Sequence, residues 1–147
     1  MAPALAPRRQ DDRVLRYAAV LFAVGFLFHT ADHLRRGSDS ISTELFWAGN
    51  TTSVVSIVVI VMVLTGYRWA PQIAAVAGFA LAFAFTSAHL LPHWSELSDS
   101  FVDGDVSAVS WVAALLEITG ALALGIAGVY ELRRRSQAGA GSGAQTG

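Results

Sequence analysis

Four long apolar segments divide the sequence, and they limit what the chain can fold into more than any other feature does. These segments are residues 14–34, 45–66, 71–91 and 106–132. A helix needs about 20 mostly apolar residues to cross the hydrocarbon core of a bilayer, and each segment has them. Only 14% of the residues are charged, whereas a soluble domain has about 25%. We therefore predict an all-α integral membrane protein, a bundle of four transmembrane helices in contact with the lipid bilayer.

The arginines predict how this bundle is oriented. All ten basic residues are arginines, and eight of them lie before or at the start of the first segment, between the second and third, or after the fourth. Only Arg35 and Arg36 lie on the opposite side. Since positive residues favour the cytoplasmic side, we expect a multi-pass protein of the cell (inner) membrane with both termini in the cytoplasm. Residues 1–13 are then a cytoplasmic segment, residues 14–132 the transmembrane domain, and residues 136–147 a disordered cytoplasmic tail.

The composition excludes several classes of protein. The chain has no cysteine, which removes disulfides, thiolate metal sites and cysteine nucleophiles. It has no lysine to attach a Schiff-base cofactor. A net charge of −1 gives no basic surface for nucleic acid. The sequence shows neither a nucleophile paired with a base nor a phosphate-binding loop, so whether the protein is an enzyme stays open.

The four histidines form two HxxxH pairs, and these pairs are the strongest functional signal in the sequence. His29 and His33 lie near the end of the first segment, and His89 and His93 near the end of the third. Residues four apart share one face of a helix. Because the first and third segments cross the membrane in the same direction, both pairs are expected at one end of the bundle. We predict that the four imidazoles converge there in one layer.

The expected depth of the histidines strengthens this prediction. The apolar run before His29 covers residues 17–28, which span about 18 Å of a hydrocarbon core about 30 Å thick. His29 is therefore expected inside the hydrocarbon region or at its edge. Polar groups at that depth usually face the interior of the bundle. Pro92 disfavours helix at the residue before it, so the sequence leaves open whether His93 lies in the helix or in the following loop.

Imidazole is a good ligand for copper, zinc, iron and nickel, so we predict a histidine-ligated transition-metal centre. His29 and His89 are the favoured ligands, and His33 and His93 are their expected partners. Asp32 adds a carboxylate that ligates the metal or orients a histidine. The alternative is an electron-transfer protein that holds heme b between His29 and His89. In that case Arg35 and Arg36 would lie beside the heme propionates.

Other polar residues support different functions. Glu117, near the middle of the fourth segment, is either a protonated buried carboxyl or a proton carrier or cation site. If Glu117 is a proton carrier or a cation site, the protein is a small proton-coupled transporter. A further alternative is a structural subunit of a larger membrane complex. Homo-oligomers are compatible with each. We expect Asn50, Ser53 and Ser110 to form hydrogen bonds between helices. A solvated acidic loop is expected to contain Asp99, Asp103 and Asp105.

The two halves of the chain resemble each other at a few positions. The first segment ends in FHTADHL and the third in AHLLPHW, and the histidine pairs are 60 residues apart. A loop rich in Ser and Asp follows each segment, and a tryptophan then lies near the start of the next helix. This similarity is compatible with a parallel repeat of two helices. Small residues four apart predict close helix contacts, at Ala74, Gly78, Ala82, Ala121 and Gly125.

Overall fold

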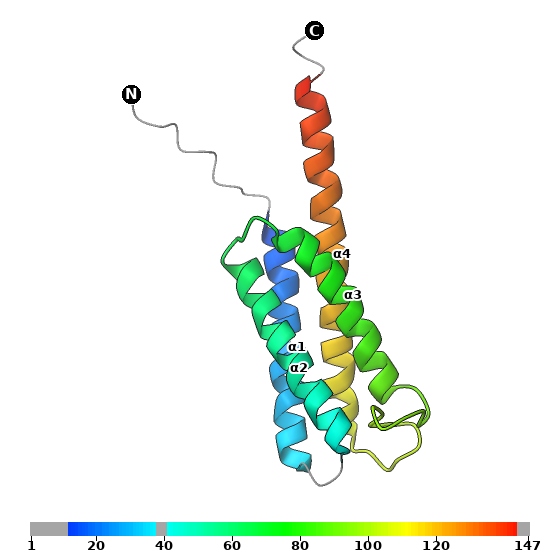
Figure 1. Ribbon diagram of the computed structural model, residues 1–147. Helices are drawn as coiled ribbons and strands as arrows, with labels where there is room; N and C mark the ends of the chain where they lie inside the picture. Colours follow the sequence, from blue (N-terminus) through cyan, green and yellow to red (C-terminus); the bar gives the residue numbers. More distant parts are fainter. Residues whose placement is uncertain (1–11, 38–40, 144–147) are drawn as a thin grey trace.

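The computed structural model describes residues 12–37 and 41–143, which form four helices (Figure 1). These helices are α1 (Arg13–Arg36), α2 (Thr43–Leu64), α3 (Ala70–His89) and α4 (Ala108–Gly143). All four are long and apolar enough to cross a membrane, and the described residues contain no strand. The predicted all-helical fold with four membrane segments is confirmed. The bounds of α1, α2 and α3 agree with the sequence prediction to within two residues.

Local sequence explains where the helices begin and end. The side chain of Ser42 accepts a hydrogen bond of 3.0 Å from the backbone of Leu45 and caps the start of α2. Pro71 lies in the first turn of α3, where a missing N–H group costs nothing. Gly37 follows α1 with a φ of 83°, a conformation that glycine adopts without strain. Pro92 prevents α3 from continuing beyond its last turn.

Helix α4 is longer than the sequence predicted. It runs to Gly143, whereas we expected it to end near residue 132 and a disordered tail to begin at residue 136. Arg134 and Arg135 both form ion pairs with Glu131, one helical turn earlier, and such pairs stabilise a helix beyond its apolar segment. Residues 144–147 and 1–11, which belong to the two predicted cytoplasmic segments, lie outside the described residues.

Helix α4 is the centre of the bundle and packs against both α1 and α3, whereas α2 makes a smaller contact with α1 and α3 (Figure 1). Glycines bring the backbones together. A Cβ atom added to Gly78 of α3 would lie 2.4 Å from the backbone nitrogen of Gly125 in α4. On the other side, a Cβ added to Gly120 of α4 would lie 2.7 Å from Cα of Phe22 in α1. The predicted close contact through small residues is thus confirmed for α3 and α4.

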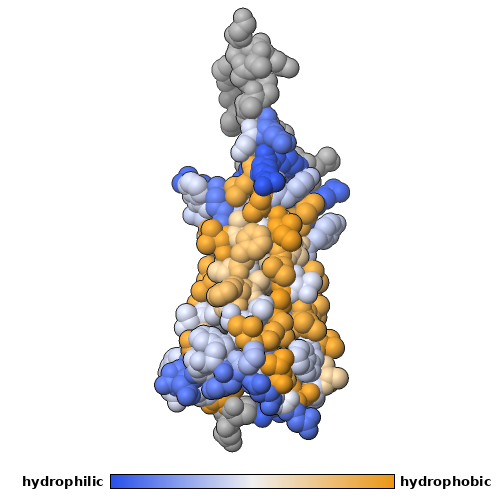
Figure 2. Space-filling view, turned by 90° about the vertical axis from the view of Figure 1, so that its right-hand side faces the viewer, coloured by the Kyte–Doolittle hydropathy of each residue, from blue (hydrophilic) through white to orange (hydrophobic). Residues whose placement is uncertain are grey.

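The outside of the bundle is apolar over most of its length. Figure 2 shows a broad hydrophobic band between two hydrophilic ends. Large apolar side chains such as Val76, Phe83 and Ile126 are more than half exposed. A surface of this kind is matched to lipid rather than to water, so the bilayer is the partner that the fold indicates.

The two ends of the bundle differ. At one end α1 begins, α2 is joined to α3 through Arg68, and α4 carries three successive arginines, Arg133 to Arg135. We call this the arginine end. At the other end α1 finishes at Arg36, α3 finishes at His89, and the loop of residues 90–107 leads into α4. We call this the histidine end. Helices α1 and α3 run in the same direction, from the arginine end to the histidine end (Figure 1).

The backbone contact at Gly78 gives a test of the packing. We expect Gly78→Ala to lower the free energy of unfolding by about 1–3 kcal/mol, because the added methyl group overpacks the contact between α3 and α4. Gly49→Ala is the matched control, since a Cβ there meets nothing within 4 Å. Unfolding in detergent, followed by circular dichroism, measures both variants. An equal effect of the two substitutions would contradict the packing described here.

Candidate metal centre

Three histidines meet at the histidine end of the bundle. His29 and His33 come from the last turns of α1, and His89 is the final residue of α3. One ring nitrogen of each lies within 4.8 Å of those of the other two. His29 and His89 are buried, with exposed fractions of 6% and 3%, and His33 is partly buried. We call these three residues the histidine cluster.

The rings of the cluster are in direct contact. Nε2 of His29 lies 2.9 Å from Nε2 of His33, which is a hydrogen-bond distance. The rings of His29 and His89 meet edge to face, with their centroids 4.8 Å apart. Two nitrogens that bind one metal ion at about 2.0–2.1 Å lie about 3–4 Å from each other. The spacing within the cluster is therefore close to that of a set of ligands, and a metal would replace the hydrogen bond between His29 and His33.

A neighbouring group holds the far nitrogen of His89. Nδ1 of His89 lies 3.2 Å from the backbone oxygen of Asp99 and 3.6 Å from its carboxylate. When Nδ1 donates its proton to these oxygens, Nε2 keeps a free lone pair. Metal-binding histidines almost always have such a carbonyl or carboxylate on the far nitrogen, which fixes the orientation of the ring. His89 thus has the surroundings of a metal ligand.

The loop after α3 closes over the cluster. The backbone N–H groups of Asp99 and Phe101 donate to the last carbonyls of α3, at 2.9 Å each. The ring of Phe101 is only 2% exposed and packs on His89, with the centroids 4.7 Å apart. Asp99 also pairs with Arg36. The prediction that Asp99 belongs to a solvated loop is wrong, because these contacts place its carboxylate against α1 and α3.

Asp32 is buried beside the cluster, but its partners are arginines. Its carboxylate accepts hydrogen bonds from Nε and Nη2 of Arg35, at 3.0 and 2.7 Å. Nε of Arg36 lies 3.4 Å from the other carboxylate oxygen. The same Arg35 donates to the hydroxyl of Ser110 in α4, so the predicted role of Ser110 in bonds between helices is confirmed. Asp32 therefore joins α1 to α4 through arginine and is not among the three clustered ligands.

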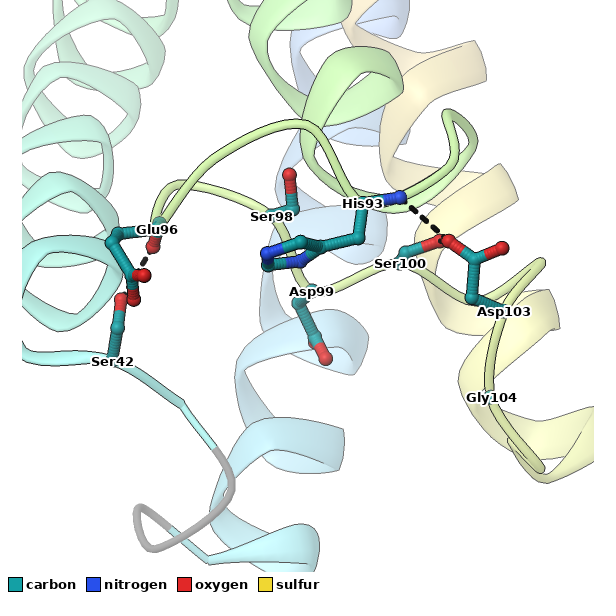
Figure 3. A pocket seen from close by; sticks show the side chains of 8 residues that line it. All are labelled: Ser42, His93, Glu96, Ser98, Asp99, Ser100, Asp103 and Gly104. Atoms are coloured by element: carbon teal, nitrogen blue, oxygen red, sulfur yellow. Dashed lines mark hydrogen bonds between the residues drawn. The ribbon is translucent and has the colours of Figure 1, made fainter.

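His93, the fourth predicted ligand, lies outside the cluster. Pro92 ends α3, and His93 is an exposed residue of the loop. Its backbone N–H donates to the carboxylate of Asp103 at 2.6 Å (Figure 3). The predicted layer of four imidazoles is thus a cluster of three. Sequence spacing alone placed His93 on the helix face of His89, whereas the proline makes the chain leave the helix before that turn is complete.

Asn50 is likewise away from the cluster. It is exposed on α2, and its amide donates to the backbone oxygen of Phe46 in the same helix, at 2.8 Å. The hydroxyl of Ser53 bonds in the same way to Gly49. The prediction that Asn50 and Ser53 bond to other helices is therefore wrong for the contacts among the described residues. A polar side chain in a helix satisfies itself locally when a carbonyl one turn earlier is within reach.

Glu117 is the polar group next to the cluster that the sequence did not place there. It lies in α4 with its side chain 2% exposed, and its Oε2 is 3.8 Å from Nε2 of His29. Oε2 has no hydrogen-bond partner within the part of the chain that the structure describes, and neither does Nδ1 of His29. No spacing rule relates residues of different helices, so only the packing of α1 on α4 reveals this pair.

A polar pocket opens beside the loop (Figure 3). Its volume is about 370 Å³, and His93, Glu96, Asp99 and Asp103 are among the residues that line it. The backbone N–H of His93 and the hydroxyl of Ser100 donate hydrogen bonds to the carboxylate of Asp103 and lower the pKa of this group. Because Asp99 lines the pocket and also contacts His89, the pocket lies next to the cluster.

Comparison of this chain with protein-family models, with curated proteins and with solved structures finds no match. The geometry of the site itself indicates its chemistry. Three imidazoles that converge at a largely buried site are suited to a transition-metal ion. They are less suited to heme b, because the rings of His29 and His89 touch and leave no plane for a macrocycle between them. Arg35 and Arg36, the predicted propionate partners, are engaged by Asp32 and Asp99.

The arginine contacts of Asp32 give a second test. We expect Asp32→Asn to lower the free energy of unfolding by about 2 kcal/mol, because a buried carboxylate that accepts from a guanidinium is replaced by an amide. Asp105→Asn, at an exposed position of the loop, is the control and should have little effect. Detergent unfolding curves compare the two. If both variants unfold like the wild type, Asp32 does not hold the histidine end together.

Proposed function

We propose that this multi-pass membrane protein binds one transition-metal ion at the histidine end of the bundle, with His29, His33 and His89 as ligands. Copper, zinc, iron and nickel are the candidate metals. One observation carries the proposal: three of the four histidines in the chain bring a ring nitrogen to within 4.8 Å of one another. Two of the three are buried in helices that the sequence places in a membrane.

The energetics of burial support a bound ion. A polar group inside a membrane is costly unless it has a partner, and such groups are usually functional. Oε2 of Glu117, which lies 3.8 Å from Nε2 of His29, is buried without a hydrogen-bond partner among the residues described. Buried polar atoms of this kind call for a specific explanation, such as an ion or a water molecule. A metal ion at the cluster would supply such an explanation for Oε2 of Glu117.

The rest of the core favours a bound centre over a transport path. Between the cluster and the arginine end, the fully buried side chains contributed by α1 and α4 are apolar, for example Phe22 and Leu124. The buried Ser56 of α2 bonds to the carbonyl of Thr52 in its own helix. We infer a site that exchanges its ion with one side of the membrane, through the polar pocket. A proton-coupled transporter that uses Glu117, or a structural subunit, remains an alternative that the experiments below separate.

The proposal includes an orientation. Eight of the ten arginines belong to the arginine end or to the terminal segment that leads into it. By the preference of positive residues for the cytoplasm, this end and both termini face the cytoplasm. The metal site then lies on the extracytoplasmic side of the cell (inner) membrane. Only two arginines, Arg35 and Arg36, belong to the histidine end.

Elemental analysis tests the metal site directly. The protein is purified in mild detergent without a histidine tag, stripped of metal, and then loaded separately with zinc, copper, nickel and ferrous ions. We expect close to one ion per chain for at least one of these metals. A chain that binds none of them after loading would overturn the proposal. A strong Soret band in the visible spectrum would instead identify heme.

Histidine variants locate the site. We expect the double variant His29→Ala and His89→Ala to lose the ion while the helical circular dichroism spectrum is retained, because two of three ligands are gone. His93→Ala is the matched control, since it removes the histidine that lies outside the cluster, and it should bind like the wild type. If the double variant keeps its metal, or if His93→Ala loses it, the ion is held elsewhere. Glu117→Gln that abolishes ion-driven proton uptake in vesicles, with the histidine variants unaffected, would favour the transporter.

A further inference from the structure

Glu117 is the buried carboxylate whose position the three-histidine site leaves unexplained. Asp32 and Asp99 each pair with an arginine at the histidine end. Glu117 has one ion-pair partner among the described residues, and this partner is His29, at 3.8 Å. A carboxylate in the membrane interior needs a cation or a proton to be stable there. The imidazole of His29 is neutral when it binds a metal, so His29 by itself provides no lasting positive charge for Glu117.

The packing of α1 on α4 fixes this pair in place. A Cβ atom added to Gly25 would lie 2.7 Å from Cα of Glu117, so the two backbones touch at that point. Gly25 lies four residues before His29, on the same face of α1. The contact at Gly120 and Phe22, one turn along α4, keeps the helices equally close. The carboxylate of Glu117 is therefore directed along α1 toward the ring of His29 by rigid helices and not by a loop.

Two distances from Nε2 of His29 are close to those between ligands of one ion. This atom lies 2.9 Å from Nε2 of His33 and 3.8 Å from Oε2 of Glu117. For ligands at about 2.0–2.2 Å from a tetrahedral ion, neighbouring ligand atoms lie about 3.3 Å apart. The two observed distances lie on either side of this value. The unpartnered Oε2 atom is also the one that faces His29.

We propose that Glu117 is the fourth ligand of the metal centre, which makes it a site of three imidazoles and one carboxylate. This inference rests on the proposed function of the cluster and extends it to a class of metal. A carboxylate is a hard ligand that suits divalent ions, whereas soft ligands select cuprous copper. The site therefore takes a divalent ion, and zinc, ferrous iron, nickel and cupric copper are the candidates. The negative charge of Glu117 offsets part of the charge that such an ion brings into the membrane.

Glu117→Gln tests the inference, because the amide keeps the shape of the side chain and removes its charge. Zinc affinity is measured by competition with a chelator, and cobalt(II) is used as a spectroscopic substitute. We expect the dissociation constant for zinc to rise by more than about 100-fold, beyond the loss typical of a residue that only orients a ligand. The ligand-field bands of bound cobalt should shift, since an anionic carboxylate donor is replaced by a neutral amide. Glu117→Asp, which keeps the carboxylate, should bind more tightly than Glu117→Gln.

Glu131→Gln is the matched control. Glu131 is another buried carboxylate of α4, but it lies at the arginine end and pairs with Arg134 and Arg135. Its substitution should leave the zinc affinity and the cobalt spectrum unchanged. An unaltered affinity and spectrum in Glu117→Gln would overturn the role of Glu117 and leave the three-histidine site standing. Equal losses in both variants would also overturn it, and a wild-type chain that binds no metal would remove both proposals.

Discussion

The direct contact of helix backbones along α4 is the feature on which the rest of the structure depends. Gly120 brings α4 against α1, and Gly125 brings it against α3, so one central helix fixes the places of both neighbours. Lipid does not drive apolar helices together, and close van der Waals contact through small residues takes over that role. Because α1 and α3 run in the same direction from this contact, their last turns meet, and His29 and His89 come together.

Ion pairs then hold the histidine end. Arg35 links Asp32 of α1 to Ser110 of α4, and Arg36 links α1 to Asp99 in the loop after α3. Asp32 is buried and Arg36 and Asp99 are partly buried, whereas Arg35 is exposed, so removal of an arginine would leave a carboxylate uncompensated in the protein interior. The network also places Asp99 on the far nitrogen of His89. The charged residues of this end thus orient the ring of His89 and also hold α1 against α4 and the loop after α3.

The arrangement of the helices bears on the predicted two-helix repeat. In a strict repeat, α2 and α4 would have equivalent surroundings. Instead α4 is central and α2 is peripheral, with much of its apolar surface exposed (Figure 1). The two histidine pairs differ as well, since both members of the first are helical and His93 is in a loop. The repeat remains a prediction from a few matching positions, and the contacts of the histidine cluster do not depend on it.

The sequence by itself determined the four apolar helices, their common end for His29 and His89, and the small residues that let helices touch. These properties follow from local composition and from the period of the helix, which act within one segment. Only the tertiary structure decided that Glu117 meets His29, that Asp99 closes over His89 and that Arg35 of α1 reaches Ser110 of α4. Those contacts join separate segments. They depend on how the helices rotate and slide against each other, and the backbone contacts at glycine fix that arrangement. The spacing of residues within one segment does not encode it.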